Sequence, residues 1–375
     1  MKNNTLKKAI LQIHLWLGLT SGLIVFIIAV TGCLYAFQEE IQNTTETYRF
    51  VEKQEKAFLL PSQLEEIARK EIPNKVLHAI KYNGPVKAVE AIFFHFEPTY
   101  HYTVYLNPYS GEVLATTNME EGFFKFILDG HFYLWLPHEV GQLVVASATL
   151  VFLIMLITGF ILWYPKNKNA VKQRFWFKWK KAPKWKRKNY DLHTITGFYV
   201  LVFAIIFAIT GLVWGFQWFS YSYYTVLGGE KSLVYEDPIS TKKIKYVKKP
   251  LDQIWALMKK EYPNAKSIEV HPPENAFSSI AANANPDEGT YGKIDYRYFD
   301  QYTIQEQKVD HIYGRYKEAK IADQLILLNY DIHTGGVFGL AGKIFAFLIS
   351  LLIASLPITG FYIWWGKTRK QNVKI

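Results

Sequence analysis

Four histidines lie within or beside long apolar segments of the sequence, and they form two related pairs. His14 and His193 each begin the pattern His-x-x-x-Gly, and each is followed 17 residues later by a Thr-Gly dipeptide. His131 and His333 precede a second shared pattern, Thr-Gly-Phe-x-x-Trp, by 27 and 26 residues. An ionisable side chain is costly to bury in a membrane and usually has a functional partner there. Their recurrence in pairs therefore makes all four histidines candidate ligands.

The pairing indicates which ligand the histidines would share. Two copies of a helix related by a twofold axis present equivalent imidazoles to a central group, which is how a haem iron is held by two histidines. We expect His14 and His193 to bind one haem near the cytoplasmic face, and His131 and His333 a second near the outer face. The single cysteine, Cys33, excludes the C-x-x-C-H attachment, so the haem would be of the non-covalent b type. Structural histidines are the alternative.

Several neighbouring residues could assist or compete with these ligands. His138 follows His131 by seven positions and would share its face on a continuous helix, so it competes as the outer ligand. Asp191 and Asp331 each stand two residues before a histidine, where they would either orient neighbouring groups or lie exposed as interfacial charges. The outer segments carry further histidines that we expect to be surface or strand residues rather than ligands: His78, His95, His101, His271 and His311.

Small residues and the choice of metal also bear on the site. Gly18, Gly22, Gly197 and the Gly335-Gly336 pair would let a flat macrocycle approach the backbone, or would simply allow close helix packing. Zinc prefers four closed ligands, which a histidine pair without a thiolate or carboxylate does not supply. Copper transfer would require more than the four methionines present.

The elements that must position the histidines are membrane spans. Half of the 375 residues are hydrophobic and 17% are aromatic, and the apolar residues occur in blocks. A bilayer core about 30 Å thick requires roughly 20 helical residues. Four runs meet this length, at about 11–37, 140–164, 192–219 and 337–365. The sequence therefore predicts a multi-pass protein of the lipid bilayer.

The charges predict the orientation of the spans. The formal net charge is +11. Three segments contain basic residues but no acidic residue: the first nine positions, residues 166–190 and the last ten positions. The positive-inside rule places these three segments in the cytoplasm and the long segments 39–135 and 220–332 outside. Attraction of the basic loop to anionic lipid explains the charge better than recognition of nucleic acid.

The chain reads as an internal duplication. Each half contains a span, an outer segment and a second span, which gives the two copies one orientation. Each outer segment is predicted to hold a helix, at about 62–71 or 251–261, followed by strands at 76–82, 88–96 and 100–107 or at 267–271, 277–284, 292–299 and 302–309. The predicted fold is a membrane α-helical protein, a four-transmembrane-helix bundle of two parallel repeats with two outer α+β modules.

The predicted boundaries follow from these features. They are 1–38 for the N-terminal segment and first span, 39–130 for the first outer module, 131–165 for an outer histidine segment and second span, 166–190 for the basic cytoplasmic loop, 191–219 for the third span, 220–330 for the second outer module, 331–366 for an outer histidine segment and fourth span, and 367–375 for the basic cytoplasmic tail.

Taken together, these motifs resemble the PepSY-associated transmembrane family, which includes bacterial iron-regulated membrane proteins and ferrisiderophore reductases. The resemblance covers nearly the whole chain. It rests on both outer modules, on both Thr-Gly-Phe-x-x-Trp span ends, and on three histidine motifs: His14-Leu-Trp-Leu-Gly18, Asp191-Leu-His193-Thr-Ile-Thr-Gly197 and Asp331-Ile-His333-Thr-Gly335. The segment Leu136-Pro137-His138-Glu139 departs from the family pattern.

The resemblance implies an oxidoreductase of the bacterial inner membrane with non-covalent haem b. Such a protein takes electrons from a cytoplasmic reductant or quinol and reduces ferric siderophore iron in the periplasm, which releases Fe(II). The family's span histidines fall on His14, His131, His193 and His333. Two other functions stay open: a non-redox membrane protein whose outer modules regulate an extracytoplasmic protease, and a siderophore or haem permease. The chain carries no G-x-G-x-x-G after a predicted strand and no Walker-type loop, so a nucleotide cofactor is not expected.

Overall fold

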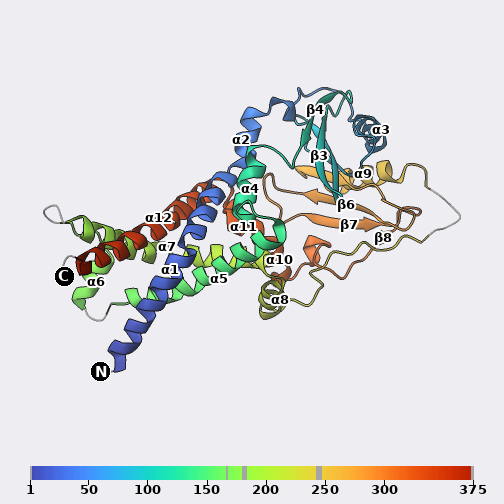
Figure 1. Cartoon of the computed structure of the whole chain (residues 1–375). Helices are drawn as coiled ribbons and strands as arrows, with labels where there is room; N and C mark the ends of the chain where they lie inside the picture. Colours follow the sequence, from blue (N-terminus) through green and yellow to red (C-terminus); the bar gives the residue numbers. More distant parts are fainter. Residues whose placement is uncertain (1, 166–167, 180–183, 242–246, 373–375) are drawn as a thin grey trace. The chain divides into compact units, whose positions relative to one another are not determined.

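A computed structural model describes residues 2–165, 168–179, 184–241 and 247–372 of the chain. The basic loop and tail predicted from sequence therefore lie partly outside the described residues. The chain divides into two units, shown in Figure 1. The helical unit comprises residues 1–38, 126–223 and 332–375, and the sheet unit comprises residues 39–125 and 224–331.

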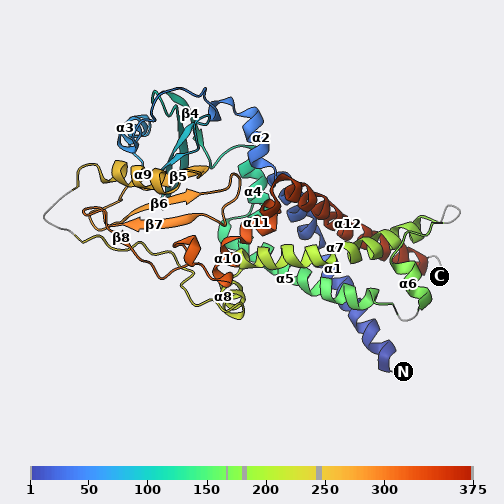
Figure 2. The ribbon, with the colours of Figure 1, turned by 180° about the vertical axis from the view of Figure 1, so that it is seen from behind.

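Four long helices form the helical unit. They are α1 (Lys2–Tyr35), α5 (His138–Trp163), α7 (Trp185–Gly215) and α12 (Gly339–Asn372). Helix α1 packs against α5 and α12, and α7 packs against the same two helices, so the four close into a bundle (Figure 2). Apolar side chains fill its centre: Val25, Leu156, Val200, Ala204, Ile349 and Ile353.

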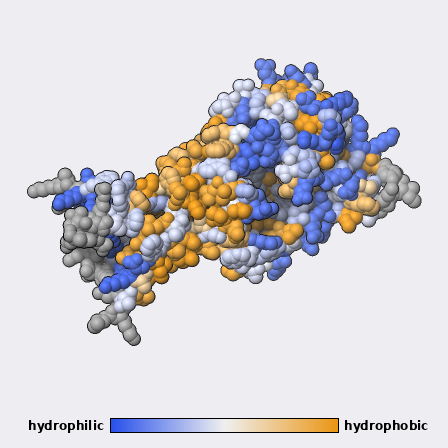
Figure 3. All heavy atoms as spheres, in the orientation of Figure 1, coloured by the Kyte–Doolittle hydropathy of each residue, from blue (hydrophilic) through white to orange (hydrophobic). Residues whose placement is uncertain are grey.

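The bundle has the length and surface of a membrane domain. Each of its four helices is long and apolar enough to cross a bilayer, over Thr5–Tyr35, His138–Trp163, Trp185–Gly215 and Gly336–Thr368. Figure 3 shows hydrophobic side chains gathered over the surface of these helices. Large apolar side chains stay exposed there, as lipid-facing positions require: among them are Leu23, Val202 and Leu348. The prediction of a multi-pass membrane protein with four spans is confirmed.

The described residues also contain shorter helices. They are α2 (Gln38–Thr45), α4 (Phe123–Tyr133), α6 (Lys168–Arg174), α8 (Gln217–Val226), α10 (Ile321–Leu327) and α11 (Asn329–Thr334), and 3₁₀ turns occur at Thr47–Arg49, Tyr316–Glu318 and Gly336–Phe338. The third span was predicted to run to residue 219. Helix α7 instead ends at Gly215, because Phe216 is extended, and α8 begins at the next residue.

The two outer segments of the sequence share one sheet. Its strands are β1 (Leu77–Tyr82), β2 (Val89–Phe96), β3 (Thr99–Leu106), β4 (Val113–Asn118), β5 (Ser267–Val270), β6 (Ile280–Asn285), β7 (Asp295–Phe299) and β8 (Glu306–Gln307). They run antiparallel in the order β4-β3-β2-β1-β5-β6-β7-β8. Strands β1 and β5 join the segments, with Ile80 opposite Val270. Two α+β segments are as predicted, whereas their union in one sheet was not anticipated.

One face of the sheet carries the hydrophobic core. Helix α3 (Pro61–Glu71) packs on β1, β2 and β3, and α9 (Pro250–Glu261) packs on β5 and β6. Their apolar faces, including Leu64 and Ile254, meet Ile80, Phe93 and Val270 of the strands, and all five side chains are fully buried. Both helices start within one residue of their predicted positions because a proline occupies the first helical turn.

Strand predictions succeeded least at the far edge of the sheet. The strand expected at 302–309 reduces to the two residues of β8. A turn replaces its first part, because the Asp300 carboxylate accepts hydrogen bonds at 2.9 Å from the amides of both Tyr302 and Thr303. Ile304 then adopts a left-handed φ of 59°. Strand β4, at the opposite edge, was not predicted.

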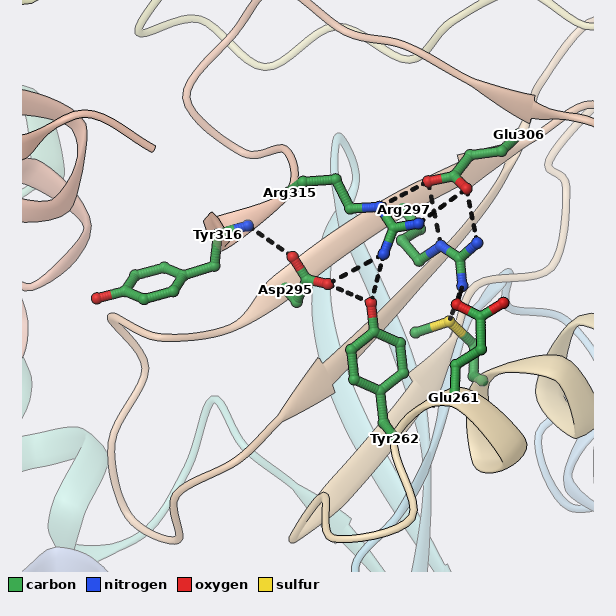
Figure 4. Close-up of polar contacts among 8 residues, drawn as sticks. Glu261, Tyr262, Asp295, Arg297, Glu306, Arg315 and Tyr316 are labelled. Carbon is green, nitrogen blue, oxygen red and sulfur yellow. Dashed lines mark hydrogen bonds and ion pairs between the residues drawn. The ribbon is translucent and has the colours of Figure 1, made fainter. Parts of the chain in front are cut away.

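A buried ion-pair network ties α9 to β7 and β8, and Figure 4 shows its members. The guanidinium of Arg297, on β7, is only 5% exposed and pairs with Glu261 of α9 and Glu306 of β8, each at 2.6 Å. Arg315 adds contacts with Glu306 at 2.8 Å and Asp295 at 3.4 Å. Burial favours the neutral form of Glu306, but the hydrogen bonds and charges of the two arginines outweigh it and lower the pKa of that carboxyl.

We predict that Arg297→Ala destabilises the sheet unit by about 1–3 kcal/mol, because it removes the buried guanidinium that Glu261 and Glu306 share, while Arg315 still pairs with Glu306. Thermal unfolding of the full-length protein in detergent, followed by circular dichroism of the β signal, would measure the loss. Lys293→Ala is the matched control, since its ion pair with Asp287 is solvent-exposed and is worth about 0–1 kcal/mol. Equal melting temperatures for the two variants would contradict the prediction.

The sheet unit also contains histidines that burial keeps neutral. Burial lowers the pKa of His78, His101 and His311, and it lowers the pKa of His271 to about 4. An unfolded histidine titrates at about 6.5. Between these values the unfolded chain binds more protons than the folded one, so folded stability is complete above about pH 6.5 and is lost as the pH falls toward 4.

We therefore predict that the melting temperature of the sheet unit falls between pH 7 and pH 5, and that His271→Gln reduces this fall because it removes the most strongly shifted imidazole. Melting curves of wild type and variant in the same detergent at both pH values would measure the difference. The same fall in both proteins would show that His271 does not contribute.

Candidate functional site

The structure brings the inner two histidines together. His14 lies near the start of α1 and His193 near the start of α7, and their ring centroids are 6.5 Å apart. Both line a cavity of about 730 Å³ within the bundle. Gly18, Gly22 and Gly197, which the sequence analysis associated with close backbone approach, line the same cavity.

The outer two histidines also meet. His131, on α4, and His333, on α11, have ring centroids 6.1 Å apart. Neither residue lies on a spanning helix, because the chain breaks between each histidine and the span that follows. After His333 the break is made by Gly335, whose φ of +78° is left-handed. Trp214 of α7 packs edge-on against the His333 ring, with centroids 5.5 Å apart.

His138 does not share a face with His131, and this corrects the expectation from their spacing. Helix α4 ends at Tyr133, and Leu134 and Trp135 both take a left-handed φ, so the helix is interrupted before α5 begins at His138. His138 is exposed and packs on the ring of Tyr133 at 4.8 Å. Of the two candidates for the outer ligand, the structure therefore brings only His131 to His333.

Each histidine is held by a threonine from a neighbouring helix. Nδ1 of His14 lies 2.9 Å from Oγ1 of Thr158 on α5, and Nδ1 of His193 lies 3.0 Å from Oγ1 of Thr359 on α12. The outer pair repeats the arrangement. His333 lies 2.7 Å from Thr210 on α7, and His131 lies 3.4 Å from Thr31 on α1.

These contacts determine the tautomer of the imidazoles. Nδ1 of His131 lies 2.8 Å from the carbonyl oxygen of Ile28, and Nδ1 of His193 lies 3.1 Å from that of Leu356. A carbonyl only accepts, so Nδ1 carries the proton in both rings. Thr158 and Thr210 donate their hydroxyls to carbonyls of their own helices, which leaves their oxygens to accept from His14 and His333. Nε2 is then the nitrogen that can bind a metal.

The glycine after three of the four threonines makes room for the ring, whereas a β-carbon at the fourth, Gly211, would be in ordinary contact with His333 at 3.7 Å. A β-carbon at Gly159 would lie 3.2 Å from Cε1 of His14, and one at Gly360 would lie 3.2 Å from Cε1 of His193. At Gly32 the distance to Cε1 of His131 would be 2.9 Å, which is closer than van der Waals contact allows. The Thr-Gly dipeptide is therefore a seat for an imidazole: the threonine binds its nitrogen and the glycine accepts its edge.

The Thr-Gly dipeptides were visible in the sequence, but the sequence analysis did not identify their threonines as hydrogen-bond partners of the histidines. The four Thr-Gly dipeptides served only to align the repeats.

The two aspartates considered as orienting groups have other partners. Asp191 accepts hydrogen bonds from Arg187 at 2.9 Å and from Trp179 at 3.2 Å. Asp331 accepts from the backbone amide of Gly292 at 2.7 Å.

The arrangement is suited to a metal that needs two ligands from the protein. Within the described part of the chain, no group of three or more His, Cys, Asp or Glu side chains is arranged to hold a metal ion. Each histidine pair instead brings two imidazole rings together, with centroids 6.5 Å apart in the inner pair and 6.1 Å apart in the outer pair. A planar chelate that supplies the remaining ligands would complete the coordination.

Comparison with known proteins assigns the chain to a family. No curated protein matches the sequence significantly. A family model described as the PepSY-associated TM region matches residues 11–367, which includes α5 and α7 in full, most of α1 and α12, the four paired histidines and the whole sheet unit. The chain thus belongs to the family of proteins with a PepSY-associated transmembrane region.

Proposed function

We propose that the protein is a haem b electron-transfer protein of the bacterial inner membrane that reduces ferric siderophore iron in the periplasm and releases Fe(II). One observation carries the proposal: two histidine pairs, each seated on Thr-Gly dipeptides, lie at opposite ends of one bundle. The 17 residues from His14 to Thr31 correspond to about 26 Å of helix, so the pairs can serve opposite faces of the membrane.

The spacing within each pair fits an iron held by two imidazoles. Imidazole nitrogens bind transition metals at about 2 Å, and each nitrogen lies about 1.1 Å from its ring centroid, so two rings that share one metal ion would have centroids about 6 Å apart. The measured separations are 6.5 Å for the inner pair and 6.1 Å for the outer pair. Both sites therefore fit a bis-histidine haem, which would make two haems in the protein.

The residues of the chain would have distinct tasks. His14 and His193 would hold one haem iron and His131 and His333 the other, and the haem, when bound, would supply one-electron exchange between Fe(III) and Fe(II). The threonines hold the imidazoles in the Nδ1-protonated form. The apolar residues of the bundle centre, such as Val200 and Ala204, exclude water between the two pairs.

The orientation follows from charge and from the equivalence of the halves. In our proposal both termini and the segment 166–190 lie in the cytoplasm, and the sheet unit, formed by the two PepSY-like modules, lies in the periplasm. The contacts of His14 with Thr158 and of His193 with Thr359 support two parallel repeats, because they join equivalent positions in the two halves. A cytoplasmic reductant or quinol would supply electrons at the inner pair, and ferric siderophore would take them at the outer side.

We predict two b-type haems in the wild type, and loss of one in each single-histidine variant. His14→Ala or His193→Ala removes the inner haem and His131→Ala or His333→Ala removes the outer one, because each pair shares one iron. Reduced-minus-oxidised spectra and pyridine haemochrome quantitation of the purified protein would count them. His138→Ala is the matched control and retains both. Haem-free wild type from haem-replete cells would sink the proposal.

The threonines give a second prediction. Thr359→Val keeps the side-chain shape but removes one of the two acceptors of the His193 Nδ1 proton, since the Leu356 carbonyl remains. We therefore expect the lower end of the usual effect of a lost supporting bond, a haem affinity about tenfold weaker. Haem titration of the apoprotein would measure the change. Thr20→Val is the control, since the Thr20 hydroxyl bonds only to carbonyls of its own helix. Equal affinity in Thr359→Val and Thr20→Val would show that the threonine does not support the ligand.

A test of electron transfer across the membrane requires vesicles that keep the reductant and the ferric siderophore on opposite sides. Proteoliposomes with a reductant inside, and with ferric siderophore and a ferrous chelator outside, should form the ferrous complex at a rate that the four-histidine variant loses. A non-redox regulator of a protease would show no difference between these two proteins. A permease would move iron into proteoliposomes that contain no reductant.

A further inference from the structure

The cavity around the inner histidines has charge at one end only. Most of its lining is apolar or small, but Arg174 of α6 and Lys367 of α12 also line it. None of the lining residues that the structure describes is acidic. The cavity therefore presents two cations without a carboxylate to compensate them, beside a large apolar space.

Arg174 is fixed in this position by the end of a spanning helix. Its Nη1 donates to the carbonyl oxygens of Leu162, at 3.1 Å, and Trp163. These carbonyls belong to the last turn of α5, which lacks partners within its own helix and carries a partial negative charge. A guanidinium has five N–H donors, so others stay available for a ligand.

Aromatic packing holds the same segment against α7. Phe175, the residue after Arg174, packs on Trp163 at 5.1 Å and on Phe198 at 5.0 Å, and Trp163 stacks on Phe198 at 3.9 Å. The Tyr199 hydroxyl also donates to the carbonyl oxygen of Phe175 at 2.8 Å. The guanidinium is thus part of a built wall of the cavity.

Lys367 lies on the helix that seats the inner histidine. It follows Gly360, which packs on His193, by seven residues, or about 10 Å along α12. Its side chain is exposed at the rim of the cavity. Tyr190 and Gln12 line the cavity as well. Its lining therefore combines a central histidine pair, apolar walls and a cationic rim.

We propose that Arg174 and Lys367 bind the carboxylates of an amphipathic macrocycle held by His14 and His193. This inference rests on the proposed function and makes it more specific. Carboxylates are the anions that a guanidinium binds best, through paired hydrogen bonds. A neutral quinol offers neither cation an anionic group, so this end of the cavity matches a carboxylate-bearing cofactor better than a lipid-soluble donor.

Haem and its dimethyl ester provide the test, because the ester lacks the negative charge of both carboxylates and is otherwise changed only by two added methyl groups. Full-length apoprotein carrying His131→Ala and His333→Ala, purified from haem-deprived cells, leaves only the inner pair to be titrated. We expect this protein to bind haem at least about tenfold more tightly than the ester, a preference of the size that one charge-assisted hydrogen bond provides. Arg174→Gln combined with Lys367→Gln should abolish the preference.

Two comparisons make the test specific. Lys172→Gln removes an exposed charge from the same helix α6 without touching the cavity lining, and it should keep the full preference. Lys367→Gln alone should reduce the preference while the Arg174 anchor of α5 stays intact. Because the preference is a ratio within one variant, a loss of folded protein does not change it.

The outcomes separate this inference from the proposed function. Equal preference in the parent protein and the double variant would overturn the role of Arg174 and Lys367 but leave the histidine ligands in place. If the protein carrying only His131→Ala and His333→Ala bound neither haem nor its dimethyl ester, the proposed function itself would be overturned. Loss of the preference in Lys172→Gln as well would show a general charge effect and would also overturn the inference.

Discussion

The hydrogen bond from an imidazole nitrogen to a neighbouring helix is the interaction on which the bundle depends. In a bilayer a polar group without a partner costs several kcal/mol, so each histidine must be bound by the protein. His14 bonds from α1 to α5, and His193 bonds from α7 to α12. His131 bonds from α4 to α1, and His333 from α11 to α7. These bonds fasten α4, α1 and α5 into one half of the bundle, and α11, α7 and α12 into the other.

The histidine rings then meet across the two halves. One half contributes His14 and His131, and the other contributes His193 and His333. A ligand held by either pair would bridge the halves, so binding of the cofactor and closure of the bundle would stabilise each other. The sheet unit has its own connection between the two segments, the antiparallel pairing of β1 with β5. Without this pairing each segment would expose the edge of a strand.

Much of this architecture could be predicted because its signals are local. Apolar run length located the spans, and the duplicated motifs paired the histidines before any contact was known. The pairing of β1 with β5 left no such signal, since it joins residues about 190 positions apart, such as Ile80 and Val270. The choice between His131 and His138 depended on the left-handed backbone of Leu134 and Trp135. Non-glycine residues of these types rarely adopt that conformation, so the sequence did not predict it. The sequence analysis used Arg174 only as one of the basic residues that predict membrane orientation. Its contact with the end of α5 was not predicted, because it joins Arg174 to Trp163, 11 residues earlier in the chain.

The choice of threonine rather than aspartate beside the imidazoles bears on electron affinity. A carboxylate that accepts the Nδ1 proton makes a histidine a stronger electron donor to its metal and favours the oxidised ion. Here Asp191 and Asp331 are occupied elsewhere, and hydroxyls and backbone carbonyls accept instead. Neutral acceptors leave the ligands less electron-rich, which favours the reduced metal. Both sites would thus hold an electron more readily than sites with carboxylate-supported histidines.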